Sequence, residues 1–520
     1  MPTNSRNSFV TQLEYLCNLD VDKASHPIKK TGIICTIGPA SKKPEVLSQM
    51  IKAGMTIARL NFSHGTHEYH AENVRMIREV LTGFPGLHLP IALDTKGPEV
   101  RTGTVDGDET KEIPLKTGAI ITVTTNDEFR DKCSPEMIYL DYKNISKVAQ
   151  PGQRIFVDDG LLNFVVKEID GENLKCEVVC GGSLPGKKGV NLAGIDIDLP
   201  PVSEKDRADL HFAVQHGLDM IFASFVRNAQ NVQAIREALG EDGKHILIVS
   251  KIENHQGLRN IDEIIEASDG IMVARGDLGV QIPQEKLIVA QKMMIAKCSR
   301  VGKPVICATQ MMESMTQKPR PTRAEIADVT NAVLDGADCV MLSGESAKGA
   351  YPIDTVRTMA EICLEAEKMF FQWRFFNELR LHTPSPTAPT HSTAISAVEI
   401  SIQSGATAII VLSTTGQAAR LISRYRPNCP VIAVMADYRI AAALQLYRGI
   451  ISVTVVEDVA DWVADADRRV QVGIKTGLRM GFVRTGDPLI VITGWKQGQG
   501  YSNTIRVIAA PPENALTAAH

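Results

Sequence analysis

The chain has 520 residues, which is too long for one ordinary hydrophobic core, so we expect several domains. An apolar content of 44% and a charged content of 22% are typical of globular proteins and exclude intrinsic disorder. The formal net charge of −4 excludes a protein held on nucleic acid by bulk positive charge. The ten cysteines show no metal-binding spacing, and we find neither a signal-like N-terminus nor an apolar run of membrane length. We therefore expect a cytoplasmic protein with no nucleic-acid or membrane partner.

Short apolar runs alternate with amphipathic segments along much of the chain. Eight such runs, each capped by polar residues, occur at 32–37, 56–60, 90–93, 220–223, 245–249, 270–273, 304–307 and 339–342. Segments between them, such as 229–239 and 284–300, have the apolar spacing of helices. Alternating buried strands and helices indicate parallel β/α units, and eight units predict a closed (β/α)8 TIM barrel.

The interval between the third and fourth runs has a different pattern. Short runs at 120–124, 154–157, 164–167 and 175–179 predict strands, with a turn at Asp170-Gly171 between the last two. A β-rich module inserted in a loop at the catalytic face of a barrel is well placed to act as a lid.

A proline-dense segment at 382–389 predicts a linker after the barrel. The runs that follow it, at 408–412, 431–434, 451–456 and 489–492, predict a C-terminal α/β domain. The expected boundaries are an N-terminal segment at 1–28, the barrel at 29–97 and 200–380, the lid at 98–199 and a C-terminal α/β regulatory domain at 381–520.

Charged and polar residues gather where the barrel runs end. The fifth run ends in Lys251 and Glu253, and the sixth in Arg275 and Asp277. Because side chains two apart share one face of a strand, we expect each pair to project together. The other runs end in Arg59, Asn61 and Ser63, in Asp94 and Thr95, in Ser224, in Thr309, and in Ser343 and Glu345. Barrel active sites lie at this end, so the pattern predicts a site for a polyanion and a metal ion.

Each of these residues also has a purely structural interpretation. Lys251 and Glu253 could form an ion pair at the barrel rim, and Asp277 could cap a helix. Thr309 could be an ordinary threonine of a β-branched strand. Arg59 could pair with a surface carboxylate, and His64 could belong to a turn. Their shared placement at strand ends favours a functional site.

Seven motifs occur in a specific order: ICTIGP (34–39), ARLNFSH (58–64), LDTKGPE (93–99), SKIEN (250–254), MVARGDLG (272–279), CATQM (307–311) and MLSGES (341–346). Together they resemble the pyruvate kinase family, particularly its animal-type, K⁺-dependent members, over about residues 28–510. The resemblance implies a phosphotransferase of the last step of glycolysis. Such an enzyme transfers the phosphoryl group of phosphoenolpyruvate to ADP, giving pyruvate and ATP. It also implies Mg²⁺ (or Mn²⁺), K⁺ and a homotetramer.

The resemblance further implies a role for each matching residue. The catalytic residues would be Lys251, Thr309 and Arg59, with Lys251 stabilising charge and Thr309 delivering a proton. The metal ligands would be Glu253 and Asp277 for Mg²⁺, and Asn61, Ser63, Asp94 and Thr95 for K⁺. Substrate contacts would come from Arg59, Lys251, Gly276, Asp277, Thr309 and Ser224. Nucleotide contacts would come from Asn61, His64, Arg101 and Lys188.

The segment STTGQA (413–418) follows a strand and precedes a helix, which suits a phosphate. An ordinary N-cap turn explains it equally well. The resemblance implies a pocket for fructose 1,6-bisphosphate made of Ser413, Thr414, Thr415, Gly416, Gln417, Ala418, Trp462, Arg469, Gly498 and Gly500. Thr414, Gln417 and Ala418 depart from the pattern of strongly activated animal forms, which carry lysine at the first position and often a hydroxyl at the last. We therefore expect weak activation.

Two other classes of function stay open on the sequence. A lyase of the pyruvate/phosphoenolpyruvate barrel type would also hold Mg²⁺ on Glu and Asp, but would not need Lys188 or the K⁺ ligands. A non-catalytic regulatory homologue would not need an intact Lys251 or Thr309. Glu99 bears on the K⁺ requirement, because family members that work without K⁺ tend to carry lysine there. Alternatively, Glu99 only begins the hinge to the lid.

Overall fold

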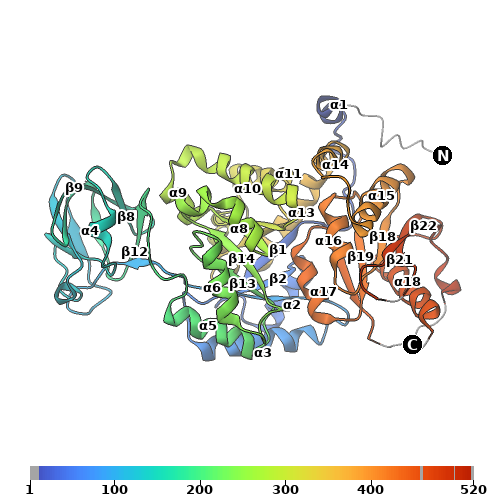
Figure 1. Ribbon diagram of the computed structural model, residues 1–520, viewed down its shortest axis with the longest axis horizontal. Helices are drawn as coiled ribbons and strands as arrows, with labels where there is room; N and C mark the ends of the chain where they lie inside the picture. The colour runs from blue at the N-terminus through green and yellow to red at the C-terminus, as the bar shows by residue number, and fades with distance from the viewer. Residues whose placement is uncertain (1–10, 457–460, 497, 517–520) are drawn as a thin grey trace.

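The computed structural model describes residues 11–456, 461–496 and 498–516. A central barrel lies between the β-rich lid at one end and the C-terminal domain at the other (Figure 1). A short helix, α1 (Gln12–Cys17), stands at the edge of the C-terminal half. The predicted N-terminal segment and C-terminal domain lie partly outside the described residues, at 1–10, 457–460, 517–520 and Gln497.

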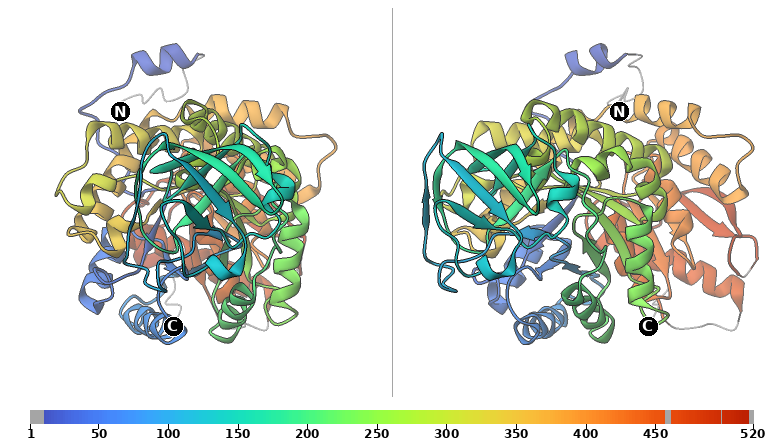
Figure 2. Two further views of the ribbon diagram at one scale, coloured as in Figure 1. Left: turned by 90° about the vertical axis from the view of Figure 1, so that its left-hand side faces the viewer. Right: turned by 60° about the vertical axis from the view of Figure 1, so that its left-hand side comes forward.

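Eight parallel strands form a closed barrel, as predicted. They are β1 (Gly32–Thr36), β2 (Ile57–Asn61), β3 (Ile91–Asp94), β13 (Met220–Ala223), β14 (Leu247–Ile252), β15 (Gly270–Ala274), β16 (Val305–Ala308) and β17 (Cys339–Leu342). Their order around the barrel follows the chain, and β1 closes it by pairing with β17. The lid lies in front of the barrel when the molecule is seen from that end (Figure 2).

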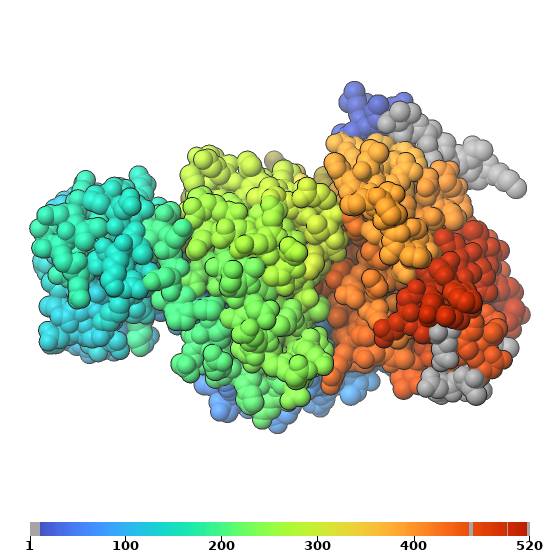
Figure 3. Space-filling view, viewed as in Figure 1, coloured from blue at the N-terminus to red at the C-terminus, as the bar shows by residue number. Residues whose placement is uncertain are grey.

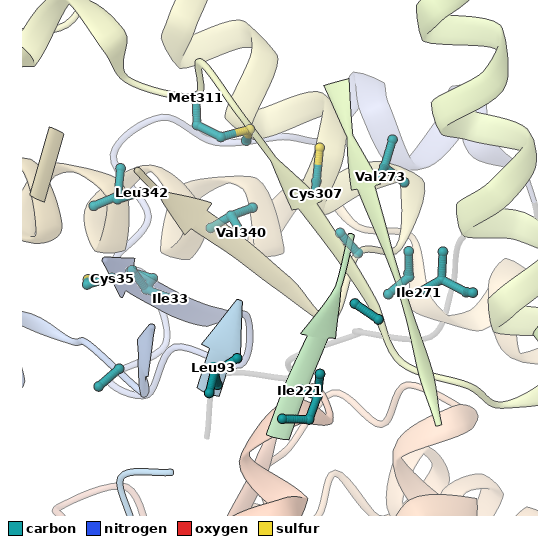
Figure 4. Close-up of a cluster of buried hydrophobic side chains, with 14 of the residues drawn as sticks. Ile33, Cys35, Leu93, Ile221, Ile271, Val273, Cys307, Met311, Val340 and Leu342 are labelled. Atoms are coloured by element: carbon teal, nitrogen blue, oxygen red, sulfur yellow. The ribbon is translucent and has the colours of Figure 1, made fainter. Parts of the chain in front are cut away.

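Apolar side chains pack on both faces of the barrel strands. Ile33 and Cys35 point outward to the surrounding helices, whereas Ile34 between them belongs to the cluster inside the barrel. Figure 4 shows part of the outer cluster, with Ile271 and Val273 of β15 beside Cys307 of β16. Burial on both faces explains why these strands form continuous apolar runs in the sequence.

Helices surround the barrel strands. They are α2 (Pro44–Ala53), α3 (His67–Leu81), α5 (Glu204–Gln215), α6 (Ala229–Leu239), α7 (His255–Arg259), α8 (Ile261–Ala267), α9 (Arg275–Gln281), α10 (Leu287–Val301), α11 (Arg323–Asp335), α12 (Gly344–Ala347) and α13 (Pro352–Met369). Two short 3-10 turns, η2 (Gln284–Lys286) and η3 (Glu313–Thr316), lie among them. The predicted helix at 284–300 is thus a 3-10 turn followed by α10. The helix after α13, α14 (Gln372–Leu381), packs in the core of the C-terminal domain.

The lid has its own sheet and core. Its seven-stranded sheet runs in the order β4 (Val100–Arg101), β12 (Gly189–Ala193), β8 (Arg154–Val157), β9 (Leu162–Asp170), β10 (Asn173–Cys180), β6 (Ile120–Thr124) and β7 (Met137–Tyr139). The other lid elements are β5 (Ile113–Leu115), β11 (Gly182–Leu184), η1 (Asp127–Phe129) and α4 (Ile145–Val148). The predicted turn at Asp170-Gly171 joins β9 to β10, while the pairing of β4 with β12 brings the two ends of the insertion together.

The C-terminal domain contains a five-stranded sheet in the order β20 (Ile450–Thr454), β19 (Val431–Met435), β18 (Ala408–Leu412), β21 (Pro488–Gly494) and β22 (Ser502–Ala509). Its helices are α15 (Pro389–Ser404), α16 (Gln417–Arg424), α17 (Tyr438–Ala443) and α18 (Trp462–Arg479), with 3-10 turns η4 (Leu444–Leu446) and η5 (Glu513–Ala515). The segment between α14 and α15 contains the predicted proline-dense linker. The space-filling view shows the lid as a separate mass joined to the barrel over part of its surface (Figure 3). Within the described residues, no helix is both long and apolar enough to cross a membrane.

Candidate active site

A buried carboxylate, Asp94 at the end of β3, is the centre of a charged cluster inside the barrel mouth. Its Oδ2 accepts a hydrogen bond from Arg59 Nε at 2.6 Å, and its Oδ1 lies 3.0 Å from Lys251 Nζ. Burial alone would raise the pKa of Asp94, but Arg59 and Lys251 outweigh it and hold that pKa below its ordinary value. Asp94 therefore stays ionised and orients two cations from different strands.

Lys251 has three polar partners. Besides Asp94, its Nζ donates to Ser224 Oγ at 2.7 Å and lies 3.1 Å from Glu253 Oε1. Burial opposes the charge, yet Asp94 and Glu253 raise the pKa of Lys251 above its ordinary value, so the side chain remains an ammonium. The prediction that Lys251 and Glu253 project together is confirmed.

Glu253 and Asp277 form a pair of neighbouring carboxyl groups. Glu253 is 2% exposed, and its Oε2 accepts a hydrogen bond from the Phe225 amide at 2.6 Å. Burial, and then the charge and hydrogen bond of Glu253, raise the pKa of Asp277 to about 8, while Lys251 opposes the change. Two carboxyls that share a proton at neutral pH suit a cation, because the cation can replace the proton's charge.

This pair fits a divalent ion that keeps other ligands. Among the described residues, no group of three or more His, Cys, Asp or Glu side chains is arranged to hold a metal. An ion on Glu253 and Asp277 would therefore complete its shell with substrate oxygens and water, which is the usual environment of Mg²⁺.

Arg275 and Asp277 do not share a strand face, and that prediction is wrong. The strand β15 ends at Ala274 and the helix α9 begins at Arg275, so the alternation of a strand no longer applies. Arg275 makes two hydrogen bonds to the Asp328 carboxylate on α11, at 2.6 and 2.7 Å. The start of α9 does leave the Gly276 and Asp277 amides in a first helical turn, where amides lack intrahelical acceptors.

Thr309 lies just past β16 in an unusual backbone conformation. Its φ is 75° and that of Gln310 is 55°, and such left-handed residues cost about 1–3 kcal/mol each. Arg275 holds this turn, because its Nη2 donates to the Thr309 carbonyl at 2.8 Å and its Nε to the Ala308 carbonyl at 3.1 Å. A Cβ on Gly276 would lie 2.8 Å from Thr309 Cγ2. The interpretation of Thr309 as a strand residue is therefore wrong.

The sequence analysis placed Arg275 among the polar residues of the site but gave it no role of its own, and it did not name Asp328. Arg275 had a signal, since it lies in the MVARGDLG motif at a strand end. Asp328 lies inside the helix α11, and no sequence pattern marks it as a functional residue.

Contacts among the described residues link each of the four predicted K⁺ ligands to another of them or to the Asp94 cluster, but do not join all four. Asn61 is the register partner of Asp94 across β2 and β3, and its Oδ1 accepts a hydrogen bond from the Ser63 amide at 3.1 Å. Thr95 is buried, and its Oγ1 accepts from the Ser224 amide at 3.1 Å. Ser63 is exposed, in the loop after β2. All four offer oxygen donors near one edge of the barrel.

Three of the four predicted nucleotide residues, all except Asn61, make no hydrogen bond or ion pair with the described residues of the Asp94 cluster. His64 is exposed in the loop after β2. In the lid, Arg101 bonds Glu99 at 2.5 Å and Lys188 pairs with Asp158 at 3.0 Å. Glu99 also lies 3.2 Å from Lys96, so two cations already neutralise its charge where the lid begins.

Six of the ten predicted effector residues line a cavity of about 780 Å³ in the C-terminal domain. Its walls include Ser413, Thr414, Thr415, Trp462, Arg469 and Gly498, together with Asp437, Asp465 and Lys496. Gly416 is the N-cap of α16, Gln417 begins that helix and Ala418 is buried in it. Gly500 lies in the loop before β22, where its carbonyl faces Thr390 Oγ1.

Comparison with known families agrees with this geometry. Residues 28–356 match the family described as pyruvate kinase, barrel domain, and residues 391–508 match pyruvate kinase, alpha/beta domain. The chain belongs to the pyruvate kinase family. Its activity is that of pyruvate kinase, a phosphotransferase of the final step of glycolysis, which decides against the lyase and the non-catalytic alternatives.

Curated pyruvate kinases match over nearly the whole chain. Pyruvate kinase PKLR of Homo sapiens is 52% identical over 505 residues, covering 96% of this chain and 88% of the relative. Pyruvate kinase 1 of Saccharomyces cerevisiae is 49% identical over 500 residues, covering 96% and 99%. Pyruvate kinase of Candida albicans is 48% identical over 506 residues, with the same coverage.

Proposed function

We propose that phosphoryl transfer from phosphoenolpyruvate to ADP takes place at the Asp94 cluster. The observation that carries this proposal is the convergence of Arg59 and Lys251 on one buried carboxylate, beside the Glu253 and Asp277 pair. Both substrates are anions, so cations must lie between them before in-line transfer can occur. Arg59 would grip the phosphoryl group and Lys251 would stabilise the charge that develops during transfer.

Glu253 and Asp277 are the residues that would hold Mg²⁺ or Mn²⁺. Such an ion supplies charge neutralisation on phosphoryl oxygens when it is bound. The burial of Asp277 beside Glu253, which raises the pKa of Asp277, supports this assignment, because a cation bound between the two carboxyls would stabilise their ionised form. The first-turn amides of Gly276 and Asp277 would hold the substrate carboxylate, while Ser224 orients Lys251.

The reaction ends with a proton transfer to carbon. The phosphorus–oxygen bond of phosphoenolpyruvate breaks as a terminal oxygen of ADP bonds to phosphorus, which leaves the enolate of pyruvate. That enolate then takes a proton on its methylene carbon. A threonine hydroxyl is a weak acid, so Thr309 would act through a water relay. Its fixed, left-handed turn supports a role in which the hydroxyl has one required position.

The remaining roles complete the proposal. The K⁺ ligands would be Asn61, Ser63, Asp94 and Thr95, and the nucleotide residues Asn61, His64, Arg101 and Lys188. The large C-terminal cavity would take fructose 1,6-bisphosphate. Exposed apolar side chains on α10, Ile288, Val289 and Val301, support self-association, for which we propose a homotetramer. Ten free cysteines support a reducing, cytoplasmic location.

Steady-state kinetics with the purified chain test the proposal. Pyruvate should form only when phosphoenolpyruvate, ADP and a divalent ion are all present, and its rate should rise with K⁺. Removing ADP should abolish it. Pyruvate release without ADP would contradict phosphoryl transfer, and full activity in a chelator would contradict the metal assignment.

A further inference from the structure

The first turn of α5 contacts two loops that border the active site. Lys205 Nζ donates to the Phe62 carbonyl at 2.7 Å, and Asp206 Oδ1 accepts from the Gly97 amide at 3.0 Å. A capping box between Ser203 and Asp206 fixes this turn. Phe62 lies in the loop after β2, and Gly97 lies where the chain leaves the barrel for the lid. One helical turn therefore holds both segments.

A buried acid fixes the position of Lys205. Its Nζ lies 2.7 Å from Asp209 Oδ2, and the other oxygen of Asp209 lies 2.7 Å from His67 Nε2. The Asp209 side chain is 1% exposed, whereas that of Lys205 is 48% exposed. The ammonium of Lys205 is thus anchored to an acid of the core, while the side chain itself is outside the core.

A histidine holds the same loop from its other side. His70 Nε2 lies 2.8 Å from the His64 carbonyl, and the His70 ring stacks on Phe62 with the centroids 4.0 Å apart. Burial lowers the pKa of His70, so the ring is neutral and its Nε2 donates to that carbonyl. Lys205 and His70 therefore fix the carbonyls on either side of Ser63.

We infer that Lys205 is a positioning residue for the end of β2 and the loop after it, which present Asn61, Ser63 and His64 to K⁺ and to the nucleotide. The inference rests on the proposed roles of those three residues. Lys205 donates to the main-chain carbonyl of Phe62, which lies between Asn61 and Ser63 in the chain. The bond therefore fixes the backbone from which both of these side chains extend. Loss of this bond loosens the loop at Phe62, although His70 still holds it at His64. Binding of K⁺ and of the nucleotide then weakens, because the binding-competent conformation is populated less often.

Substitution of Lys205 by methionine tests this role, since methionine keeps the apolar stem and removes the charge and the donor. The K⁺ concentration at half-maximal rate should rise about tenfold, as expected for one lost charge-assisted bond. The KM for ADP should rise severalfold, whereas the KM for phosphoenolpyruvate and kcat at saturating K⁺ should change little. Lys244→Met is the matched control, because Lys244 pairs with Glu241 at 3.0 Å on the exposed surface.

A second variant, Lys205→Gln, separates positioning from a general loss of stability. Its amide N–H can still donate to the Phe62 carbonyl, so the K⁺ response should return part of the way to that of the wild type. Thermal unfolding of each variant is followed alongside the kinetics. A normal K⁺ response in Lys205→Met would overturn the inference, even if the unfolding temperature fell. A wild-type rate that is independent of K⁺ would overturn the proposed cation site, and the inference with it.

Discussion

Replacement of Lys251 by methionine tests the centre of the site. In the intact cluster, Arg59 and Lys251 balance Asp94 and Glu253, and Asp277 carries a proton near neutral pH. Without Lys251 the cluster gains a net negative charge, and Ser224 Oγ loses its donor. Breaking a buried pair costs about 3–5 kcal/mol of folding free energy, and we expect the lower value because Arg59 still neutralises Asp94.

The effect on catalysis should exceed the effect on folding. Losing a preorganised donor that meets developing charge lowers kcat by about a thousandfold, or about 4 kcal/mol of transition-state stabilisation. The assay is kcat at saturating phosphoenolpyruvate, ADP, Mg²⁺ and K⁺, with the folded fraction measured by circular dichroism. Lys297→Met is the control, since Lys297 pairs with Asp262 at 2.6 Å on the outer surface. A folded Lys251→Met variant with near-normal turnover would refute the proposed role.

Three further changes examine other parts of the proposal. Thr309→Ala should slow the exchange of pyruvate methyl protons with solvent by about a hundredfold, measured by NMR, and undiminished exchange would remove Thr309 from the proton relay. Glu99→Lys should keep substantial turnover when a bulky organic cation replaces K⁺, because the lysine ammonium can replace the charge of the ion. The wild type should lose activity under these conditions, and full wild-type activity without K⁺ would contradict the proposal that this site needs an external cation. Calorimetry should detect weak binding of fructose 1,6-bisphosphate, because Ala418 cannot donate a hydrogen bond, and no heat at millimolar ligand would count against the effector site.

The barrel could be predicted from the sequence because its strands are buried on both faces. Strands such as β15, with all five residues buried, appear as uninterrupted apolar runs. The lid strands β4 and β12 and the edge strand β22 were not predicted. β4 has only two residues, and β22 is mainly half-buried or exposed, so neither forms a continuous apolar run. Cross-strand pairing, which a single segment does not reveal, defines them.

The site was predictable where a strand carries it and less so where a helix or a turn does. Lys251 in β14 and Glu253, one residue past the end of that strand, lie 3.1 Å apart, as the alternation of a strand predicted. Arg275 and Asp277 diverge because a helix begins between the strand and the acid. Asp328 contacts Arg275, and Lys205 contacts the Phe62 carbonyl, each from a helix that is distant in sequence, and neither has a local pattern that marks it. The backbone turn at Thr309 likewise depends on Arg275, which is a tertiary contact.

The place of the lid in the barrel has a consequence for engineering. Strands β3 and β13 pair directly although the whole lid lies between them in the chain, and β4 and β12 bring the two connections side by side. The lid also has its own hydrophobic core. The predicted lid, residues 98–199, can therefore be tested as a cassette: a short linker in its place should leave the pairing of β3 with β13 intact. Exchange of this cassette between relatives would test the proposed nucleotide contacts of Arg101 and Lys188 while leaving Lys251 and Glu253 in the barrel unchanged.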